Sequence, residues 1–256
     1  MPPFALRRLL FAALLLAIPP CVGGAAAEPG PARTVYLSFD DGPLGGTDRL
    51  LAIVGRHGIR VSMMLTGLHA LGGPSRGADV ARAKADPLVF VANHGFTHAW
   101  RQRYAAFYAH PRLVLADFEA SRATLGLEER IARLPGRNVW LVGTRARSGD
   151  PAALQAAQAL GAAGYRVYGW DVYWANDAAG RSRQTAAALA QAIEAAAPAA
   201  FTPGHVVVVA HDQMFRRAES GALLDDLVGR LKRRQWRFEG LDRYPAAQSV
   251  QRAPAP

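Results

Sequence analysis

The chain has very little cysteine and very little lysine. It holds one cysteine, Cys21, among 256 residues, and only Lys84 and Lys232 are lysines, so arginine accounts for 28 of the 30 basic residues. If Cys21 is removed with the N-terminal segment, a cysteine nucleophile and a disulfide framework are both excluded. The basic residues are scattered along the chain, whereas nucleic-acid-binding proteins concentrate them on one element, so no nucleic-acid partner is expected.

Long apolar runs are also scarce. Residues 9–18 form an apolar run that is too short to span a bilayer, which needs about 20 residues, and no later segment is long and apolar enough. Two arginines precede this run, and small residues follow it up to Ala27. The pattern predicts a signal peptide over residues 1–27, cleaved after Ala27, and hence a periplasmic or secreted protein without a membrane span. A lipid anchor on Cys21 is the alternative for this segment.

The rest of the chain has no internal repeat, no phosphate-binding glycine loop and no Gly-x-Ser-x-Gly nucleophile motif. Instead, short apolar runs alternate with segments of helical periodicity. Strands are expected at residues 34–40, 60–66, 88–93, 131–134, 165–171, 205–210 and 236–241, and helices at 47–57, 79–84, 111–125, 151–163, 184–197 and 223–234. This alternation predicts one α/β domain over residues 28–256, with a core at about 34–241 and a parallel sheet of about seven strands. An open doubly wound sheet and a closed barrel both fit the periodicity.

Two adjacent carboxylates end the first expected strand. Residues 38–43 read Ser-Phe-Asp-Asp-Gly-Pro, which places Asp40 and Asp41 before a Gly-Pro turn. Neighbouring side chains of an extended strand point to opposite faces, so the turn is needed to bring both carboxylates to one site. One carboxylate can then hold a metal ion while the other takes a proton from water. A solvated turn is the alternative if this segment is considered alone.

Two histidines follow the third expected strand. His94 and His98 are four residues apart, which would place them on one face of a helical turn, where two neutral imidazoles can hold one divalent ion. Two unrelated surface histidines are the alternative. Taken with the aspartates, however, the pair makes a set of two histidines and one carboxylate that suits Zn²⁺ or a similar ion, and a second carboxylate is left to act as a base.

Five segments, in order along the chain, resemble the motifs of the polysaccharide deacetylases of carbohydrate esterase family 4, the NodB-homology domain. The resemblance covers about residues 34–241, nearly all of the mature chain. The matching segments are residues 38–43 (Ser-Phe-Asp-Asp-Gly-Pro), residues 94–98 (His-Gly-Phe-Thr-His), residues 133–135 (Arg-Leu-Pro), residues 168–174 with their Trp near a strand end, and residues 209–211 (Val-Ala-His). The family fold implied by this resemblance is a distorted (β/α) barrel, usually of seven strands.

The resemblance also implies a metal centre. By comparison with the family motifs, Asp41, His94 and His98 would be the ligands of one divalent ion. Zn²⁺ is expected, and Co²⁺, Ni²⁺ or Mn²⁺ would fit the same ligands.

Catalytic roles follow from the same resemblance. Asp40 would be the catalytic base, and Arg133 would orient it through a charge-assisted hydrogen bond. His211 would be the general acid that protonates the leaving amine. The next residue, Asp212, has no motif support and is expected to face solvent.

The sequence departs from the family pattern in two motifs. Gly95 replaces the Ser or Thr that usually follows the first metal histidine, so a hydroxyl that braces the loop is lost. In the fourth motif, Tyr173 stands directly before Trp174 where the family has aspartate. Asp171 is then the carboxylate expected to tune His211, and Trp174, at a strand end, is a candidate for stacking on a sugar.

The expected function is metal-dependent removal of N-acetyl groups from an amino-sugar polymer or oligomer, such as peptidoglycan, a chitin-like glycan or an exopolysaccharide. An acetylated glycan is thus the expected partner. Two alternatives stay open. The same chemistry would serve an O-acetyl esterase or the hydrolysis of a non-sugar amide, and the altered motifs would fit a carbohydrate-binding member of the fold with weakened catalysis.

Overall fold

The computed structural model describes residues 33–245, which fall within one unit of the chain. The expected signal peptide over residues 1–27, with Cys21 inside it, lies outside the described residues. Within residues 33–245, no helix combines the length and the apolar character that crossing a membrane requires.

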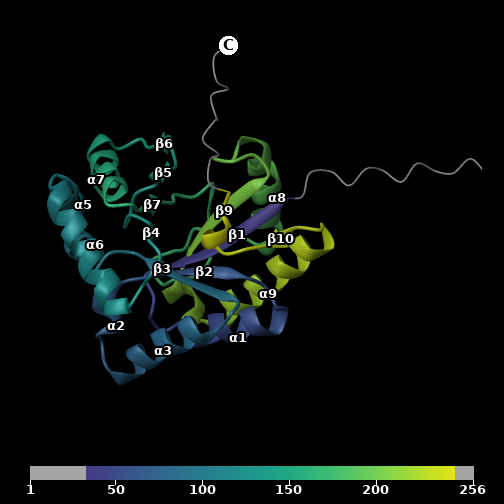
Figure 1. Cartoon of the computed structure of the whole chain (residues 1–256). Coiled ribbons are helices and arrows are strands. Elements are labelled where there is room, and N and C mark those ends of the chain that lie inside the picture. The colour runs from purple at the N-terminus through teal and green to yellow at the C-terminus, as the bar shows by residue number, and fades with distance from the viewer. Residues whose placement is uncertain (1–32, 246–256) are drawn as a thin grey trace, which may run out of the picture. The chain divides into compact units, whose positions relative to one another are not determined.

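The unit is built on one curled sheet whose central strands are parallel (Figure 1). Along the curl the parallel strands are β8 (Val172–Tyr173), β9 (His205–His211), β1 (Thr34–Asp40), β2 (Val61–Leu65), β3 (Val89–Asn93), β4 (Ile131–Ala132) and β7 (Arg166–Val167). The expectation of a distorted barrel with about seven parallel strands is therefore confirmed. The central strands read as unbroken apolar runs because helices cover one face of the sheet and packed side chains fill the other.

Of the strand expected over residues 165–171, only residues 166–167 form a strand, β7, which pairs with β4. After four intervening residues the chain continues as β8, which pairs with β9 at the other end of the curl. Between them, the amide of Tyr168 donates to Ala132 and the amide of Asp171 donates to Val207. This crossing segment, residues 166–173, thus connects both ends of the curl by main-chain hydrogen bonds.

Three further strands lie beside the parallel set. β5 (Trp140–Val142) and β6 (Arg145–Arg147) form an antiparallel hairpin that joins the sheet at β7, and the sequence did not predict them. β10 (Arg237–Phe238) pairs with the first residues of β1. The last expected strand is therefore present, but it is shorter than predicted and lies outside the curl.

Helices form the outer layer of the unit (Figure 1). Their bounds are α1 (Thr47–His57), α2 (Gly67–Ala70), α3 (Pro74–Ala85), α4 (His98–Gln102), α5 (Tyr104–Tyr108), α6 (Pro111–Leu125), α7 (Pro151–Ala162), α8 (Ala186–Ala196) and α9 (Ala218–Arg233). α6 illustrates why the sequence predicts them well: proline opens its first turn, and Gly126 ends it in the left-handed conformation that glycine adopts without strain. α3 and α9 begin earlier than predicted, and the short helices α2, α4 and α5 were not predicted.

The two faces of β1 explain how the sheet serves both the core and the site. Val35, Leu37 and Phe39 point outward into the hydrophobic layer under the helices. The alternate side chains, such as those of Tyr36 and Asp40, point into the curl, as the two-residue period of a strand requires. The inner side is apolar near the start of β1 and becomes charged at its carboxyl end.

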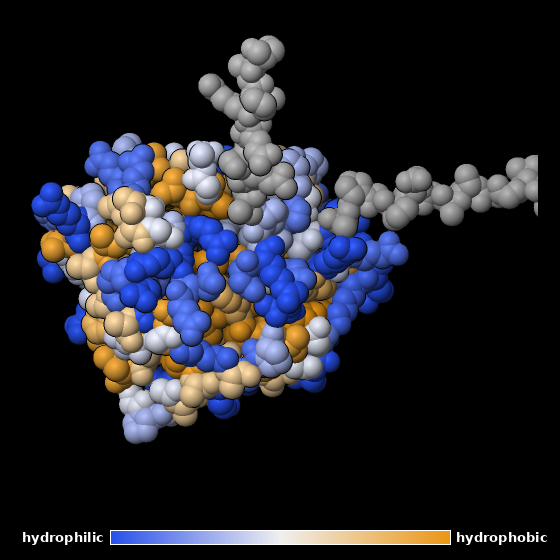
Figure 2. All heavy atoms as spheres, in the orientation of Figure 1, coloured by the Kyte–Doolittle hydropathy of each residue, from blue (hydrophilic) through white to orange (hydrophobic). Residues whose placement is uncertain are grey.

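Hydrophilic and hydrophobic residues are interspersed on the face drawn in Figure 2. Among the described residues, the large hydrophobic side chains that are exposed are Leu71, Leu113 and Tyr173. The first two lie on the outer helical layer, whereas Tyr173 ends β8 at the mouth of the curl. Tyr173 is exposed there because it lines a cavity.

The core between α9 and the sheet is expected to carry much of the stability. Leu227→Ala removes a fully buried side chain of α9 and should lower the free energy of unfolding by about 3 kcal/mol through lost apolar burial and a residual cavity. Leu113→Ala is the matched control, since Leu113 is also helical but half exposed, and should change it by less than about 0.5 kcal/mol. Urea unfolding measures both, and equal effects would contradict this packing.

Candidate active site

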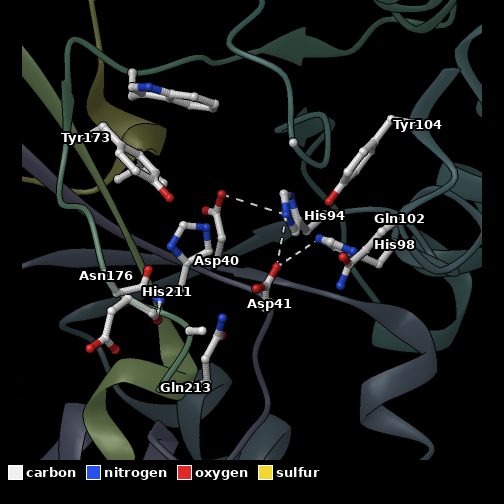
Figure 3. A pocket seen from close by; sticks show the side chains of 15 residues that line it. Asp40, Asp41, His94, His98, Gln102, Tyr104, Tyr173, Asn176, His211 and Gln213 are labelled. Carbon is white, nitrogen blue, oxygen red and sulfur yellow. Dashed lines mark hydrogen bonds and ion pairs between the residues drawn. The ribbon is translucent and has the colours of Figure 1, made fainter. Parts of the chain in front are cut away.

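The charged residues singled out in the sequence meet at the carboxyl ends of the parallel strands. Asp40 and His211 are direct neighbours in the β1–β9 ladder, and Asn93 pairs with Ala132, so His94 and Arg133 leave β3 and β4 at the same level. They surround a cavity of about 720 Å³ (Figure 3). Its lining is Asp40, Asp41, His94, His98, Gln102, Tyr104, Gly136, Trp170, Tyr173, Asn176, Asp177, Ala178, Val209, His211 and Gln213.

Asp41 reaches the same cavity as Asp40 because the backbone turns at Asp41 itself. Its φ of 75° is in the left-handed region, which aspartate tolerates better than most residues. The turn is held in place by the ring of His69, which contacts the carbonyl of Asp41, and by the amide of Thr66, which donates to Gly42. The bend thus falls one residue before the expected Gly-Pro turn. It nevertheless brings both carboxylates to one cavity, as the sequence predicts.

The two histidines converge without a regular helical turn. Gly95 reverses the chain with a φ of 78°, and residues 98–102 then form a turn of left-handed helix with φ between 51° and 71°. The expectation that His94 and His98 lie on one face of a right-handed turn is therefore wrong. Their ring centroids are nevertheless 5.3 Å apart.

Three side-chain atoms face one another at this point (Figure 3). Asp41 Oδ1 lies 3.0 Å from His98 Nε2 and 3.4 Å from His94 Nε2. The three ligand atoms are all within 4.8 Å of one another, so these residues could hold one metal ion. Burial opposes the ionisation of Asp41, but the two histidines outweigh it and hold the pKa of its carboxyl well below its usual range.

The hydrogen bond on the far side of His94 tests whether a cation fits. His94 Nδ1 lies 3.0 Å from the carbonyl oxygen of Arg133, so in the neutral form of the ring this nitrogen carries the proton. In that form Nε2 presents a lone pair to Asp41 Oδ1, which within residues 33–245 is buried without a hydrogen-bond donor. A proton on Nε2 or a divalent ion between the two atoms would satisfy both, and the donor set therefore fits a metal ion.

Asp40 has a different set of partners. Its Oδ1 accepts a hydrogen bond of 2.8 Å from the guanidinium of Arg133, which has no exposed surface. The same guanidinium donates to Ser38 Oγ at 2.7 Å and to the carbonyls of Tyr168 and Gly169 at 3.1 and 2.9 Å. Asp40 Oδ2 lies 3.7 Å from His94 Nε2, and Asp40 lines the cavity. The geometry thus supports the predicted orienting contact of Arg133.

His211 lines the cavity beside Asp40, but its expected partner lies elsewhere. Asp171 accepts hydrogen bonds from the amides of Phe201 and Val207 at 2.9 and 3.0 Å, and its Oδ1 pairs with Arg147 at 3.0 Å. Val207 precedes His211 by four residues, or about 13 Å of strand at 3.3 Å per residue. The expectation that Asp171 tunes His211 is therefore wrong. Among the described residues, Nδ1 of His211 is buried without a hydrogen-bond partner.

Two other expectations are corrected. Asp212 is fully buried instead of facing solvent, and it accepts hydrogen bonds from Gly46 N at 2.8 Å and Thr47 Oγ1 at 2.6 Å. Burial raises the pKa of its carboxyl. Trp174 does not face the cavity: it packs against Phe215 in the outer core.

The aromatic wall of the cavity is formed by residues that the sequence did not single out. Trp170 and Tyr173 line the cavity with ring centroids 6.1 Å apart. Tyr104 lies across the cavity from Tyr173 (Figure 3). Tyr173 and Trp174 are neighbours on a strand, so one faces the cavity when the other faces the core. The alternation of side chains along the strand was the available signal, and it would have placed Tyr173 in the cavity.

The buried pair of Arg133 and Asp40 gives a prediction about stability. Arg133→Gln should lower the free energy of unfolding by about 3–5 kcal/mol, because it leaves Asp40 charged and buried without its cation. Arg166→Gln is the control, since the pair of Arg166 with Glu129 is solvent-exposed and should contribute less than about 1 kcal/mol. Denaturant unfolding compares the two, and a small effect at Arg133 would contradict its central position.

Comparisons with known proteins agree on one family. The family model described as "Polysaccharide deacetylase" matches residues 27–164, more than half of the chain. No curated protein sequence matches the chain.

Solved structures share the fold at low sequence identity. A family 4 carbohydrate esterase from Streptomyces lividans, in complex with acetate, is 23% identical with a TM-score of 0.56, over 80% of this chain and 91% of that one. The catalytic domain of a peptidoglycan N-acetylglucosamine deacetylase from Eubacterium rectale is 20% identical with a TM-score of 0.62, over 88% and 96%. A Streptococcus mutans CE4 esterase is 19% identical with a TM-score of 0.62, over 81% and 85%. The solved structures show a shared fold. The family model, which matches more than half of the chain, shows that the chain belongs to the polysaccharide deacetylase family of hydrolases.

Proposed function

We propose that this cavity removes N-acetyl groups from an amino-sugar polymer or oligomer in a metal-dependent reaction. One observation carries the proposal. Asp41, His94 and His98 turn three ligand atoms toward one point, and Asp40 stands beside that point with one oxygen bound by Arg133 and the other near His94. This arrangement separates a candidate ligand carboxylate from a candidate base, although the two aspartates are neighbours in sequence.

The residues divide the proposed reaction between them. Asp41, His94 and His98 would hold the ion, which in such sites polarises a carbonyl group and makes water more acidic. Asp40 takes a proton from the attacking water, whose oxygen forms a bond to the acetyl carbon. Arg133 keeps the carboxylate of Asp40 in place. His211 gives a proton to the nitrogen as the carbon–nitrogen bond breaks, so that acetate and a free amine leave.

The ligand set also bears on the metal. Two imidazole nitrogens and one carboxylate oxygen leave positions open for water and substrate, a pattern typical of catalytic Zn²⁺. We therefore propose Zn²⁺ as the ion, with Co²⁺, Ni²⁺ and Mn²⁺ as metals that the same donors would accept.

A glycan substrate is supported by the walls of the cavity. Trp170, Tyr173 and Tyr104 offer aromatic faces on both sides of the charged centre, and Asn176 and Gln213 add polar groups that can bind hydroxyls. The solved relative from Eubacterium rectale is a peptidoglycan N-acetylglucosamine deacetylase, which favours an amino sugar. We place this reaction in the periplasm or outside the cell, where the predicted signal peptide would deliver the protein.

A second candidate function is glycan binding with weakened catalysis. It is favoured by His211, whose Nδ1 is buried and finds, in the part of the chain that the structure describes, no carboxylate or other partner to hold the ring in one tautomer. In that case the chain would bind acetylated glycans but release acetate very slowly.

Acetate release from a panel of acetylated glycans tests the proposal and separates it from the alternatives. We expect release from N-acetylglucosamine oligomers, its loss in chelator, and its return when Zn²⁺ or Co²⁺ is added back. Release from acetylated xylan alone would favour an O-acetyl esterase. Glycan binding without any release would favour the second candidate and reject the proposed hydrolysis.

Substitutions at the centre should separate chemistry from metal binding. Asp40→Asn should lower kcat by at least about 10²-fold, because the proton acceptor is lost, while the bound metal per chain stays unchanged. The double variant His94→Ala with His98→Ala should lose both metal and activity. Elemental analysis of each purified variant, alongside its acetate release, is the measurement. Full turnover by the first variant, or full metal content in the second, would reject the assigned roles.

A further inference from the structure

The loop that carries the two histidines has a backbone with little intrinsic support. Gly95 has a φ of 78°, and residues 98–102 are five consecutive non-glycine residues in the left-handed region. Each such residue is less stable than it would be in the right-handed conformation, so the turn persists only if its surroundings hold it. His98 is the first residue of this turn, and its ring position depends on the turn being kept.

Asp117, on the inner side of α6, supplies hydrogen bonds to this loop. Its Oδ1 accepts from Phe96 N at 2.7 Å, and its Oδ2 accepts from Thr97 N at 3.1 Å and from Thr97 Oγ1 at 2.6 Å. The side chain is buried, and no arginine, lysine or histidine within residues 33–245 forms an ion pair with it. Its negative charge is therefore balanced by the loop donors themselves.

Thr97 passes this support on to the left-handed turn. Thr97 Oγ1, while donating to Asp117, accepts a hydrogen bond of 2.9 Å from Trp100 N. The carbonyl of Thr97 accepts from Arg101 N at 2.9 Å. The residue directly before His98 is thus fixed by α6 on one side and by the turn on the other.

Gly95 and Asp117 occupy complementary space. A Cβ atom on Gly95 would lie 2.9 Å from Asp117 Oδ1, closer than side chains approach one another, and the left-handed φ would strain any other residue. The carboxylate of Asp117 thus stands where a side chain at position 95 would need room.

We infer that Asp117 is a positioning residue that sets the geometry of the pair of His94 and His98 by holding residues 95–98 in place. The expected effect on metal binding rests on the proposed metal site. The contacts of Asp117 with the loop do not depend on that proposal. Substituting a residue that holds a metal ligand in place, without binding the metal itself, typically changes metal affinity by 10–100-fold.

Asp117→Asn tests the inference, because it keeps the size of the side chain and replaces one acceptor oxygen by a donor. The control is Asp79→Asn, since Asp79 is equally buried on α3, pairs with Arg76 and Arg82, and does not contact the loop. Two readouts are taken: the dissociation constant for Zn²⁺ or Co²⁺ by calorimetry, and amide hydrogen exchange of the metal-free chain.

We expect Asp117→Asn to weaken metal binding 10–100-fold and to speed amide exchange over residues 95–103 about tenfold, with exchange in β1 unchanged. Asp79→Asn should alter neither. Thr97→Ala should weaken binding similarly, and the effects of the two substitutions should combine less than additively, because both remove the hydrogen bond between Thr97 Oγ1 and Asp117 Oδ2.

Unchanged exchange over residues 95–103 in Asp117→Asn would overturn the inference, as would metal affinity within twofold of the wild type. If the wild-type chain itself binds no divalent ion, the proposed function fails, and the exchange rates still decide whether Asp117 holds the loop. If Asp117→Asn does not fold, Thr97→Ala carries the same two measurements.

Discussion

The structure depends on one buried cation, the guanidinium of Arg133. A charge with no exposed surface is tolerated only when its donors are paired, and here they are paired with Asp40, Ser38 and two main-chain carbonyls of the crossing segment. These partners come from β1 and from the segment that links the two ends of the curl. Arg133 therefore ties the sheet together across its interior at the level where the cavity opens.

This placement gives two neighbouring aspartates separate environments. Asp40 faces a permanent cation, whereas Asp41, turned by its left-handed backbone, faces two imidazoles. In water two adjacent carboxylates would differ little. Inside this cavity the two carboxylates have different hydrogen-bonding partners. Their proposed roles, one as a base and the other as a metal ligand, follow from those partners.

Most of the fold could be read from the sequence because its long elements have clear local signals. The valine run of β9 and the proline and glycine at the ends of α6 are examples. The hairpin of β5 and β6 was missed because strands of three residues have almost no periodicity. The left-handed turn after His98 was missed because none of its residues favours that conformation; hydrogen bonds from outside the segment impose it.

The candidate site was predictable where a motif fixes both residue type and strand end, as for Asp40 and His94. Asp171 was misplaced because sequence position gives the direction of a side chain but not its height in the barrel. Asp171 and Tyr173 point the same way, yet Asp171 lies one layer deeper, beside Val207. The aromatic wall was missed for a related reason, since it exists only because the crossing segment spans the mouth of the curl.

Arg133 contacts two residues of the site, one through its side chain and the other through its main-chain carbonyl. The guanidinium holds Asp40, while the carbonyl oxygen of the same residue fixes the ring of His94. Any replacement at this position keeps its peptide carbonyl and gives up only the guanidinium. In a fold stable enough to survive the loss of this buried pair, one substitution would therefore silence the base and leave the ion-binding half intact, which opens a route from a hydrolase to a lectin on the same scaffold.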